Sequence, residues 1–513
     1  MQKIMDFFSK HQVIKSILKW ILLYIVIWIL YDVLYKLGRS PNDNLQTIRT
    51  MMVVPIVYAL GKGCYLYGKK ELDAEKLATL LLIIGFTLRI GYAFYTGSST
   101  RQHDVEMYNN GNLNLSGQGH FSYTYIIYST GMLPQEMRWQ FYHPPLWHSL
   151  CALFMHIYEF FEGTNDVATL YNANIILSSF VGCLTLYYIK KIIFYFSENK
   201  YYRIIALLIL AFHPQFFIMA GWMNNEGLSF MFMIMSFYYG LLFNQNRKWQ
   251  DIILCGVSLG FAAMSKVSAA LICAPLLMIF IYDFVKDVKN KTYKKTLLQG
   301  LTFIGIVAPL SLWFIVRNIV KFGITSVGVP GMDPYKSSLG VVSYSLWQRF
   351  GIPNIFNLNE GLWCILRPNS NNYLDYNVWL YTFKCSVFGE YSFWQGEIFA
   401  YMLLITNILV IIFALYCMIY VLIKNIKSFN NILMLLTYII TIISYIAFQI
   451  IYPLTCTQDF RYMTLVLIPS AYFVGQYFSL ENKNKITIKF KYLSLALIFS
   501  FCLSSVLFYI SCR

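Results

Sequence analysis

The sequence predicts an all-α protein that crosses a membrane many times. Of its 513 residues, 58% are hydrophobic and only 12% are charged, whereas soluble domains carry about 25% charged residues. Helices in lipid need apolar residues on their outer surface as well as inside. A soluble enzyme and a disordered protein are therefore excluded. The net charge of +16 is the Lys and Arg excess expected of cytoplasmic loops, so no nucleic-acid partner is expected.

Apolar runs define the expected helices in order along the chain. About thirteen runs have roughly the length of a membrane-spanning helix. A further run, 145–161, is ambiguous. The thirteen runs are 17–35, 48–67, 77–95, 170–190, 203–220, 222–243, 251–266, 268–285, 297–317, 397–423, 431–452, 460–479 and 491–511.

The basic residues indicate whether the ambiguous run spans the membrane, because cytoplasmic loops retain Lys and Arg. All the basic clusters fall on one side of the membrane only if residues 145–161 do not cross it. We therefore expect 145–161 to lie at the outer interface, the amino terminus inside and the carboxyl terminus outside. Lys36, Arg39 and Arg49 are the exception to this charge pattern. The clusters lie at 3–19, 62–76, 190–203, 247–248, 286–295, 424–427 and 483–491.

Two long polar stretches then face outward and divide the chain. They are poor in Lys and Arg but rich in Trp, Tyr, His, Asn and Gly, a composition typical of folded, ligand-binding loops. The active site is expected there. The predicted units are an amino-terminal hairpin at 1–76, a core at 77–317 with its outer loop at 96–161, a second outer loop at 318–396, and carboxyl-terminal helices at 397–513.

Asp104 follows an outward-ending helix, where a carboxylate stays ionised and reaches a lipid-borne substrate. One interpretation is a general base that removes a proton from an acceptor hydroxyl. The other is a helix cap or a turn acceptor, roles that Asp commonly fills. Glu106 is a second carboxylate nearby, expected to be solvated or paired with Arg101.

The segment Tyr142-His143-Pro144-Pro145 predicts a rigid corner before a helix. Pro144 biases His143 towards an extended backbone, and Pro145 suits the first turn of a helix. The free N–H groups of such a helix end favour a phosphate. The alternative is a turn that only starts the interfacial helix.

Lys266 and Arg317 are basic residues that the charge pattern of the loops does not explain. Lys266 lies in a break between two short apolar runs, and Arg317 lies at an outward helix end. Ionisable residues at membrane depth are functional candidates, and both are expected near a phosphate. The alternative, which also applies to Arg461, is that they snorkel to the lipid headgroups.

Three further patterns have competing interpretations. His103, Asp104, His120, His143 and His148 could bind a divalent metal, although their spacing matches no metal motif. Trp347, Trp363 and Trp394 could stack on a sugar. Gly256-Val-Ser-Leu-Gly260 matches a nucleophile elbow, but within an apolar run it predicts close packing of helices instead.

Ordered motifs give the chain a specific resemblance. The first loop holds His103-Asp104, Gly119-His120, Gly131-Met-Leu-Pro134 and Tyr142-His-Pro-Pro-Leu146. Later come His213-Pro214, Met223-Asn-Asn-Glu226, Met264-Ser-Lys266, Trp313-Phe-Ile-Val-Arg-Asn318, Phe388-Gly-Glu390 and Asp459-Phe-Arg-Tyr462. Over about residues 77–480 this set resembles the polyprenyl-phosphate-sugar-dependent glycosyltransferases of the GT-C fold. It is most similar to the bacterial relatives of protein O-mannosyltransferases and the lipid A aminoarabinose transferase.

The resemblance implies an inverting transfer with Asp104 as the base and His143 near the donor phosphate. Some relatives carry Lys at the position of His143, and their Asn-Asn-Asp reads Asn-Asn-Glu here. The substrate-binding residues expected from the matched motifs and the basic candidates are His103, Glu106, His120, Tyr142, His143, Asn225, Glu226, Lys266, Arg317, Glu390, Arg461 and Tyr462.

The expected function is transfer of a sugar from a polyprenyl-phosphate donor to an acceptor hydroxyl on the extracytoplasmic face. The acceptor is a protein, a lipid or a polysaccharide, and membrane lipids surround the chain, with a bacterial plasma membrane as the expected location. No cofactor is expected, and a divalent cation stays an open alternative. A transporter or flippase of a lipid-linked solute is the second hypothesis, and an inactive lipid-binding scaffold is the third.

Overall fold

The computed structural model describes residues 12–36, 45–324, 333–337, 339–352, 376–391, 393, 396–481 and 484–511. Within these ranges the regular secondary structure is helical apart from one isolated β-bridge between Gly340 and Leu454 and one short hairpin, in which β1 (Tyr108–Asn109) pairs antiparallel with β2 (Asn112–Leu113). The predicted all-α class is therefore confirmed.

Ten helical segments of the described chain are long and apolar enough to cross a membrane. The protein is thus a multi-pass membrane protein. The segments are α2 (Gln12–Lys36), α3 (Leu45–Gly68), α4 (Ala74–Thr96), α7 (Val167–Ala173) joined to α8 (Ile175–Phe196), α11 (Asn225–Asn246), η2 (Val267–Ile272) joined to α13 (Cys273–Lys289), α14 (Tyr293–Phe322), α18 (Glu397–Asn425), α19 (Phe429–Ile451) and α21 (Lys485–Ser511).

The expected count of about thirteen spans is not confirmed, since the described chain gives ten, or eleven with one bent pair. The run 203–220 forms the bent pair, α9 (Lys200–Phe212) and α10 (Pro214–Gly221), with a 46° bend. The run 251–266 forms α12 (Trp249–Ser265), which has only 17 residues. The run 460–479 divides into η5 (Phe460–Val466) and α20 (Leu467–Ser479). The first and third differences arise where the backbone breaks within an apolar run, whereas α12 is an unbroken helix that is shorter than the candidate spans and ends at Lys266.

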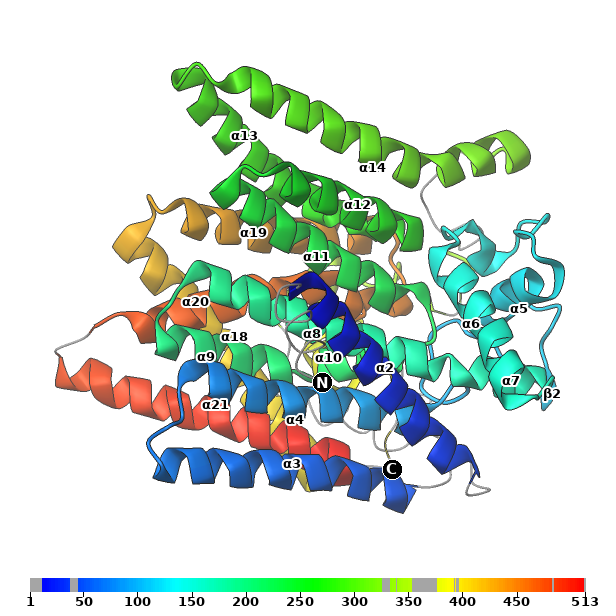
Figure 1. Ribbon diagram of the computed structural model, residues 1–513, viewed down its shortest axis with the longest axis horizontal. Coiled ribbons are helices and arrows are strands. Elements are labelled where there is room, and N and C mark those ends of the chain that lie inside the picture. Colours follow the sequence, from blue (N-terminus) through cyan, green and yellow to red (C-terminus); the bar gives the residue numbers. More distant parts are fainter. Residues whose placement is uncertain are drawn as a thin grey trace, which may run out of the picture.

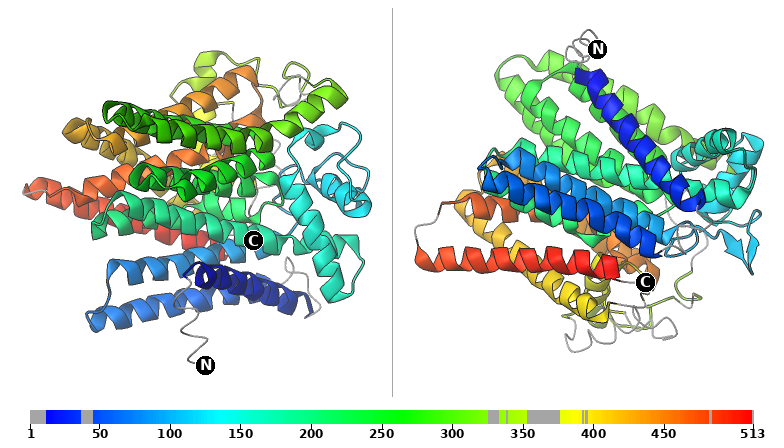
Figure 2. Two further views of the ribbon diagram at one scale, coloured as in Figure 1. Left: turned by 45° about the horizontal axis from the view of Figure 1, so that its top comes forward. Right: turned by 60° about the horizontal axis from the view of Figure 1, so that its bottom comes forward.

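The bundle has two different ends (Figure 1). The turns that follow α3, α13 and α18 lie at one end, and these turns carry three of the basic clusters. The elements of the first outer loop lie at the other end, as the views of Figure 2 also show. These elements are α5 (His120–Thr130), η1 (Trp139–Tyr142) and α6 (Leu146–Glu162). The charge pattern therefore corresponds to a real separation in space.

Helix α6, the ambiguous run, is not among the candidate spans of the described chain. It begins after Pro145, and it buries Trp147, Met155 and Tyr158 while Phe160 and Phe161 stay exposed. An amphipathic helix with exposed aromatic residues is typical of a membrane interface. The prediction that this run does not span is therefore consistent with the structure.

The break between α9 and α10 is stabilised by a buried arginine. Pro214 cannot continue the hydrogen bonding of α9, and the Arg89 guanidinium instead donates to the carbonyl oxygens of Leu210 and Ala211, at 3.5 and 3.1 Å. Arg89 is fully buried in α4. The cation satisfies carbonyl groups that would otherwise lack partners in lipid, and so α10 can turn towards the first loop.

Close packing, and not catalysis, explains the two glycines of α12. A Cβ at Gly260 would lie 2.6 Å from the Leu310 side chain, and one at Gly256 would lie 3.3 Å from Phe303. Both neighbours belong to α14. The prediction of small-residue helix packing is therefore confirmed. The remaining helices are α15 (Leu346–Phe350), α17 (Val378–Phe388) and η4 (Thr455–Gln458).

Candidate active site

Residues far apart in the sequence meet where the first outer loop joins the bundle. Six of the predicted site residues belong to this convergence. They are His103 in the first loop, Glu226 in the first turn of α11, Lys266 in the break after α12, Glu390 after α17, and Arg461 and Tyr462 in η5.

Helix ends position Glu226 and Lys266. The Asn224 side chain caps α11 by accepting from the Glu226 N–H at 3.0 Å. Asn225 donates from its amide to the Ser265 carbonyl oxygen at 2.8 Å, which ties the start of α11 to the end of α12. Lys266 follows with an extended backbone, φ −155° and ψ 136°. The predicted helix break at Lys266 is confirmed, and in this structure Asn225 positions the backbone on which Lys266 stands.

Glu226 is shared by two cations. Its Oε1 pairs with the Lys266 ammonium and lies 3.6 Å from Arg461 Nε. The Arg461 guanidinium also donates to the Tyr462 hydroxyl at 2.9 Å, and the Lys266 ammonium lies 5.5 Å from the centre of the Tyr462 ring. We call Glu226, Lys266 and Arg461 the ion cluster.

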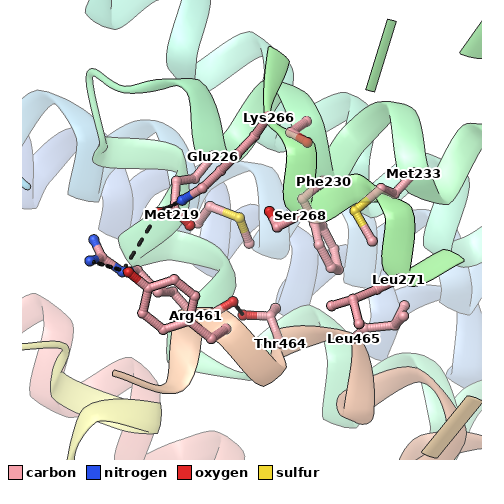
Figure 3. A pocket seen from close by; sticks show the side chains of 12 residues that line it. Met219, Glu226, Phe230, Met233, Lys266, Ser268, Leu271, Arg461, Thr464 and Leu465 are labelled. Carbon is pink, nitrogen blue, oxygen red and sulfur yellow. Dashed lines mark hydrogen bonds and ion pairs between the residues drawn. The ribbon is translucent and has the colours of Figure 1, made fainter. Parts of the chain in front are cut away.

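The ion cluster forms one end of a pocket within the bundle. Lys266, Glu226 and Arg461 lie together in Figure 3, whereas Met233, Leu271 and Leu465 lie at the opposite end. The pocket is thus charged at one end and apolar at the other. Its other lining residues are Met219, Ser229, Phe230, Ser268, Tyr462 and Thr464.

His103 lies beside the ion cluster, between two carboxylates. Its Nδ1 is 3.3 Å from Glu390 Oε2 and its Nε2 is 3.2 Å from Asp459 Oδ2. Asp459 is fully buried. Asp459 is not among the site residues that the sequence predicts, and its place in the Asp459-Phe-Arg-Tyr462 motif is the sequence signal that points to it.

Asp104 and Glu106 are exposed on the same short stretch of the first loop. Arg101, Asp104 and Glu106 all have left-handed backbones, with φ of 51°, 55° and 49°. Such non-glycine conformations cost of order 1–3 kcal/mol each and gather at functional sites. The carboxyl group of Glu106 is partly shielded from water, and this desolvation, reinforced by the charge of Asp104, raises its pKa.

The backbone of Asp104 is held against the start of α5. The Asp104 carbonyl accepts from the His120 N–H at 2.8 Å, and the Val105 carbonyl accepts from Phe121 at 3.0 Å. A Cβ at Gly119 would lie 2.7 Å from Asp104 O, so this close approach requires glycine. The Gly119-His120 pair therefore fixes the loop that presents Asp104.

Three histidines form a separate buried stack behind this loop. His120 Nδ1 lies 2.9 Å from His148 Nε2, and the rings of His120 and His143 are stacked. Burial lowers the pKa of His120 to about 3, and the positive charges of Lys266 and Arg461 contribute. Burial also lowers the pKa of His143 and of His148 well below 6.5. The stack is therefore neutral at pH 7.

His143 occupies the predicted corner. Its backbone is extended, with φ −67° and ψ 143°, three residues before α6 begins. The neighbouring Tyr142 accepts at its carbonyl from Asn318 at 3.4 Å, and burial raises the pKa of the Tyr142 phenol. The corner is confirmed, but the neutral imidazole of His143 brings no charge for a phosphate.

Arg317 contacts the first loop. Its guanidinium donates to the Pro134 carbonyl at 2.7 Å and to Asn318 Oδ1 at 3.1 Å. In this structure it fastens the outer end of α14 to the first loop and does not contact the ion cluster. Trp347 is 79% exposed on α15, and Trp363 and Trp394 lie outside the described residues.

Part of this site lies in a segment that matches the model of a known protein family. The family model described as dolichyl-phosphate-mannose-protein mannosyltransferase matches residues 142–313. The matched segment contains Tyr142, His143, Asn225, Glu226 and Lys266. No curated protein matches the chain. With the many apolar helices, the match supports a multi-pass membrane glycosyltransferase of the GT-C kind, related to the mannosyltransferases.

Proposed function

We propose that this chain transfers a sugar from a polyprenyl-phosphate donor to an acceptor hydroxyl on the extracytoplasmic face of the membrane. The transfer inverts the configuration at the sugar, and Asp104 is the general base. The acceptor is a protein, a lipid or a polysaccharide.

The pocket that runs from the ion cluster to apolar walls is the observation that carries this proposal. A polyprenyl-phosphate sugar has a charged phosphate joined to a hydrocarbon chain, and it needs a site with both properties. Lys266 and Arg461 supply two positive charges at one end, and Phe230, Met233 and Leu271 supply apolar contacts beyond. The pocket therefore fits such a donor better than a soluble nucleotide sugar.

The two cations of the ion cluster favour a departing phosphate. Glu226 holds Lys266 and Arg461 side by side at one end of the pocket. The bond between the sugar carbon and the phosphate oxygen breaks during transfer, and negative charge develops on the leaving phosphate. Cations held in place before the reaction stabilise that charge at no cost of rearrangement.

Asp104 is suited to receive the acceptor's proton. Its side chain is exposed on the first loop, and its backbone is held by the start of α5. The acceptor oxygen attacks the sugar carbon from the face opposite the phosphate, and the hydroxyl proton passes to the Asp104 carboxylate. Attack from that face produces the inversion.

The two ends of the bundle support an extracytoplasmic site. Basic turns gather at the end away from the first loop (Figure 1), and basic loops stay in the cytoplasm. The first loop would then face outward, in a bacterial plasma membrane. Accessibility labelling of a cysteine introduced at Gln135 in intact cells tests this orientation.

Turnover of purified protein with polyprenyl-phosphate sugars tests the proposal. Asp104→Asn should lower transfer by about 100- to 10,000-fold, the range of a general base, and leave expression unchanged. Glu136→Gln is the matched control, since Glu136 is an exposed carboxylate of the same loop that pairs only with Arg138 in the described structure. Full activity of Asp104→Asn would refute the assignment of the base.

A transporter or flippase is the second candidate, and one observation favours it. The bent pair α9–α10 and the break at Lys266 resemble the discontinuous helices of transporters. Sugar transfer in detergent distinguishes the two functions, because a flippase needs a sealed compartment and releases no glycosylated product. Donor translocation in vesicles without transfer would favour the flippase.

A further inference from the structure

Three side chains from different parts of the chain lie together beside the ion cluster. His103 comes from the first loop, Glu390 from the segment after α17, and Asp459 from the segment before η5. One ligand atom of each lies within 4.8 Å of the others. We propose that His103, Glu390 and Asp459 form a binding site for a divalent transition metal ion.

Unpartnered buried atoms are the first argument. His103 is 6% exposed and Asp459 is fully buried, yet His103 Nε2 and Asp459 Oδ2 have no hydrogen-bond partner in the described structure. The two atoms face each other at 3.2 Å without the direction that a hydrogen bond needs. Two ligands of one tetrahedral zinc ion, each about 2 Å from the metal, also lie about 3.3 Å apart and off each other's axis.

The surrounding contacts orient the two carboxylates towards His103. Asp459 Oδ1 accepts from the Arg461 N–H at 2.8 Å, which leaves Oδ2 towards His103. Glu390 Oε1 accepts from the Tyr381 hydroxyl at 2.8 Å, which leaves Oε2 towards His103. Metal-binding carboxylates are oriented by such outer contacts. Asp459 thus keeps one oxygen for the protein and one for an ion at His103 Nε2, whereas Glu390 Oε2 faces the other ring nitrogen, Nδ1, and orients the imidazole.

The ligand types select the metal. Imidazole nitrogen suits zinc and other transition metals, whereas carboxylate oxygen suits manganese, magnesium and calcium. An imidazole nitrogen beside carboxylate oxygen therefore favours Mn²⁺ or Zn²⁺ over Mg²⁺ or Ca²⁺. An adjacent dication also offsets the cost of two buried negative charges.

Metal binding to the full-length protein in detergent tests this site without any donor. We expect the metal-stripped protein to bind one Mn²⁺ or Zn²⁺ per chain by isothermal titration and elemental analysis. Glu390→Gln and Asp459→Asn should each weaken binding by at least about 10-fold, the smallest loss typical of metal-site changes. Asp459→Asn keeps the oxygen that accepts from Arg461, and size-exclusion chromatography verifies that each variant is folded.

Glu159→Gln is the control, because Glu159 lies 3.5 Å from the exposed His156 and forms the same type of pair away from the site. It should bind the metal as the unchanged protein does. The proposed site is refuted if the folded unchanged protein binds no ion, which is the result expected of a His103 that only pairs with two acids. It is also refuted if both site variants bind the metal as tightly as the unchanged protein. Since no donor is present, this result is independent of the proposed transfer reaction.

Discussion

The ion cluster and the histidine stack are both buried at the same end of the bundle, but they differ in charge. Glu226 lies between Lys266 and Arg461, so each charge of the ion cluster has a partner of opposite sign. The histidines face one another and the two cations, and burial keeps them neutral. Burial alone therefore does not decide whether a basic residue can serve as a phosphate ligand. The charge of the neighbouring groups decides whether it stays positively charged.

The largest expected effect on donor binding comes from removing a cation of the ion cluster. Lys266→Ala should weaken donor binding by about 10- to 100-fold, since a hydrogen bond to a charged group contributes about 1.5–3 kcal/mol. Titration of a polyprenyl-phosphate sugar measures this loss. Lys321→Ala, which removes an ammonium bonded to Gln135 on the first loop, should bind as before. Equal losses in both variants would contradict the special role of the ion cluster.

The next effect concerns the stability of the histidine stack towards acid. The pKa of His120 is about 3 in the folded protein against 6.5 ordinarily, so the unfolded state binds more protons below pH 6.5. Stability is then lost progressively as the pH falls from 6.5 towards 3. His148→Phe, which keeps an aromatic ring beside Tyr123, should reduce this acid-dependent fall in melting temperature by a few degrees.

Thermal unfolding in detergent at pH 7 and pH 4.5 measures the difference. The exposed His156 provides the control, because His156→Phe should leave the pH dependence unchanged. If His148→Phe and the unchanged protein lose stability in parallel, the stack is not held neutral by burial.

A smaller effect is expected for His143 itself. His143→Gln should change donor affinity by less than about threefold, because a neutral ring is replaced by a neutral amide and no charged hydrogen bond is lost. Donor affinity should also be constant between pH 6 and pH 8. A rise in affinity as the pH falls, abolished by His143→Gln, would show that this residue acts as a cation after all.

The smallest change in donor affinity is expected for Arg317. Arg317→Ala removes hydrogen bonds to Pro134 and Asn318, so it should loosen the first loop and leave donor binding within about twofold, since no phosphate contact is lost. Limited proteolysis near Pro134 should become faster. A loss of affinity as large as that of Lys266→Ala would instead place Arg317 in the phosphate site.

Much of the fold followed from local properties of the chain. Apolar length predicted the spans, and the corner at His143 followed from the two prolines, because lipid and proline geometry constrain any backbone. The count of about thirteen failed where helices break, at Pro214 and Lys266. There a distant side chain such as Arg89 decides whether the interrupted backbone is stable.

The sequence by itself determined the membrane class, the polar outer loop and most residues of the candidate site. Hydropathy and motifs can be recognised in this way because they depend on residues that are close together in the sequence. Only the tertiary structure decided which of these residues are electrostatic partners. It joined Glu226 to Lys266 and Arg461, placed Asp459 beside His103, and kept His143 neutral. Electrostatic partners act over a few ångströms in space, and these partners lie tens to hundreds of residues apart along the chain.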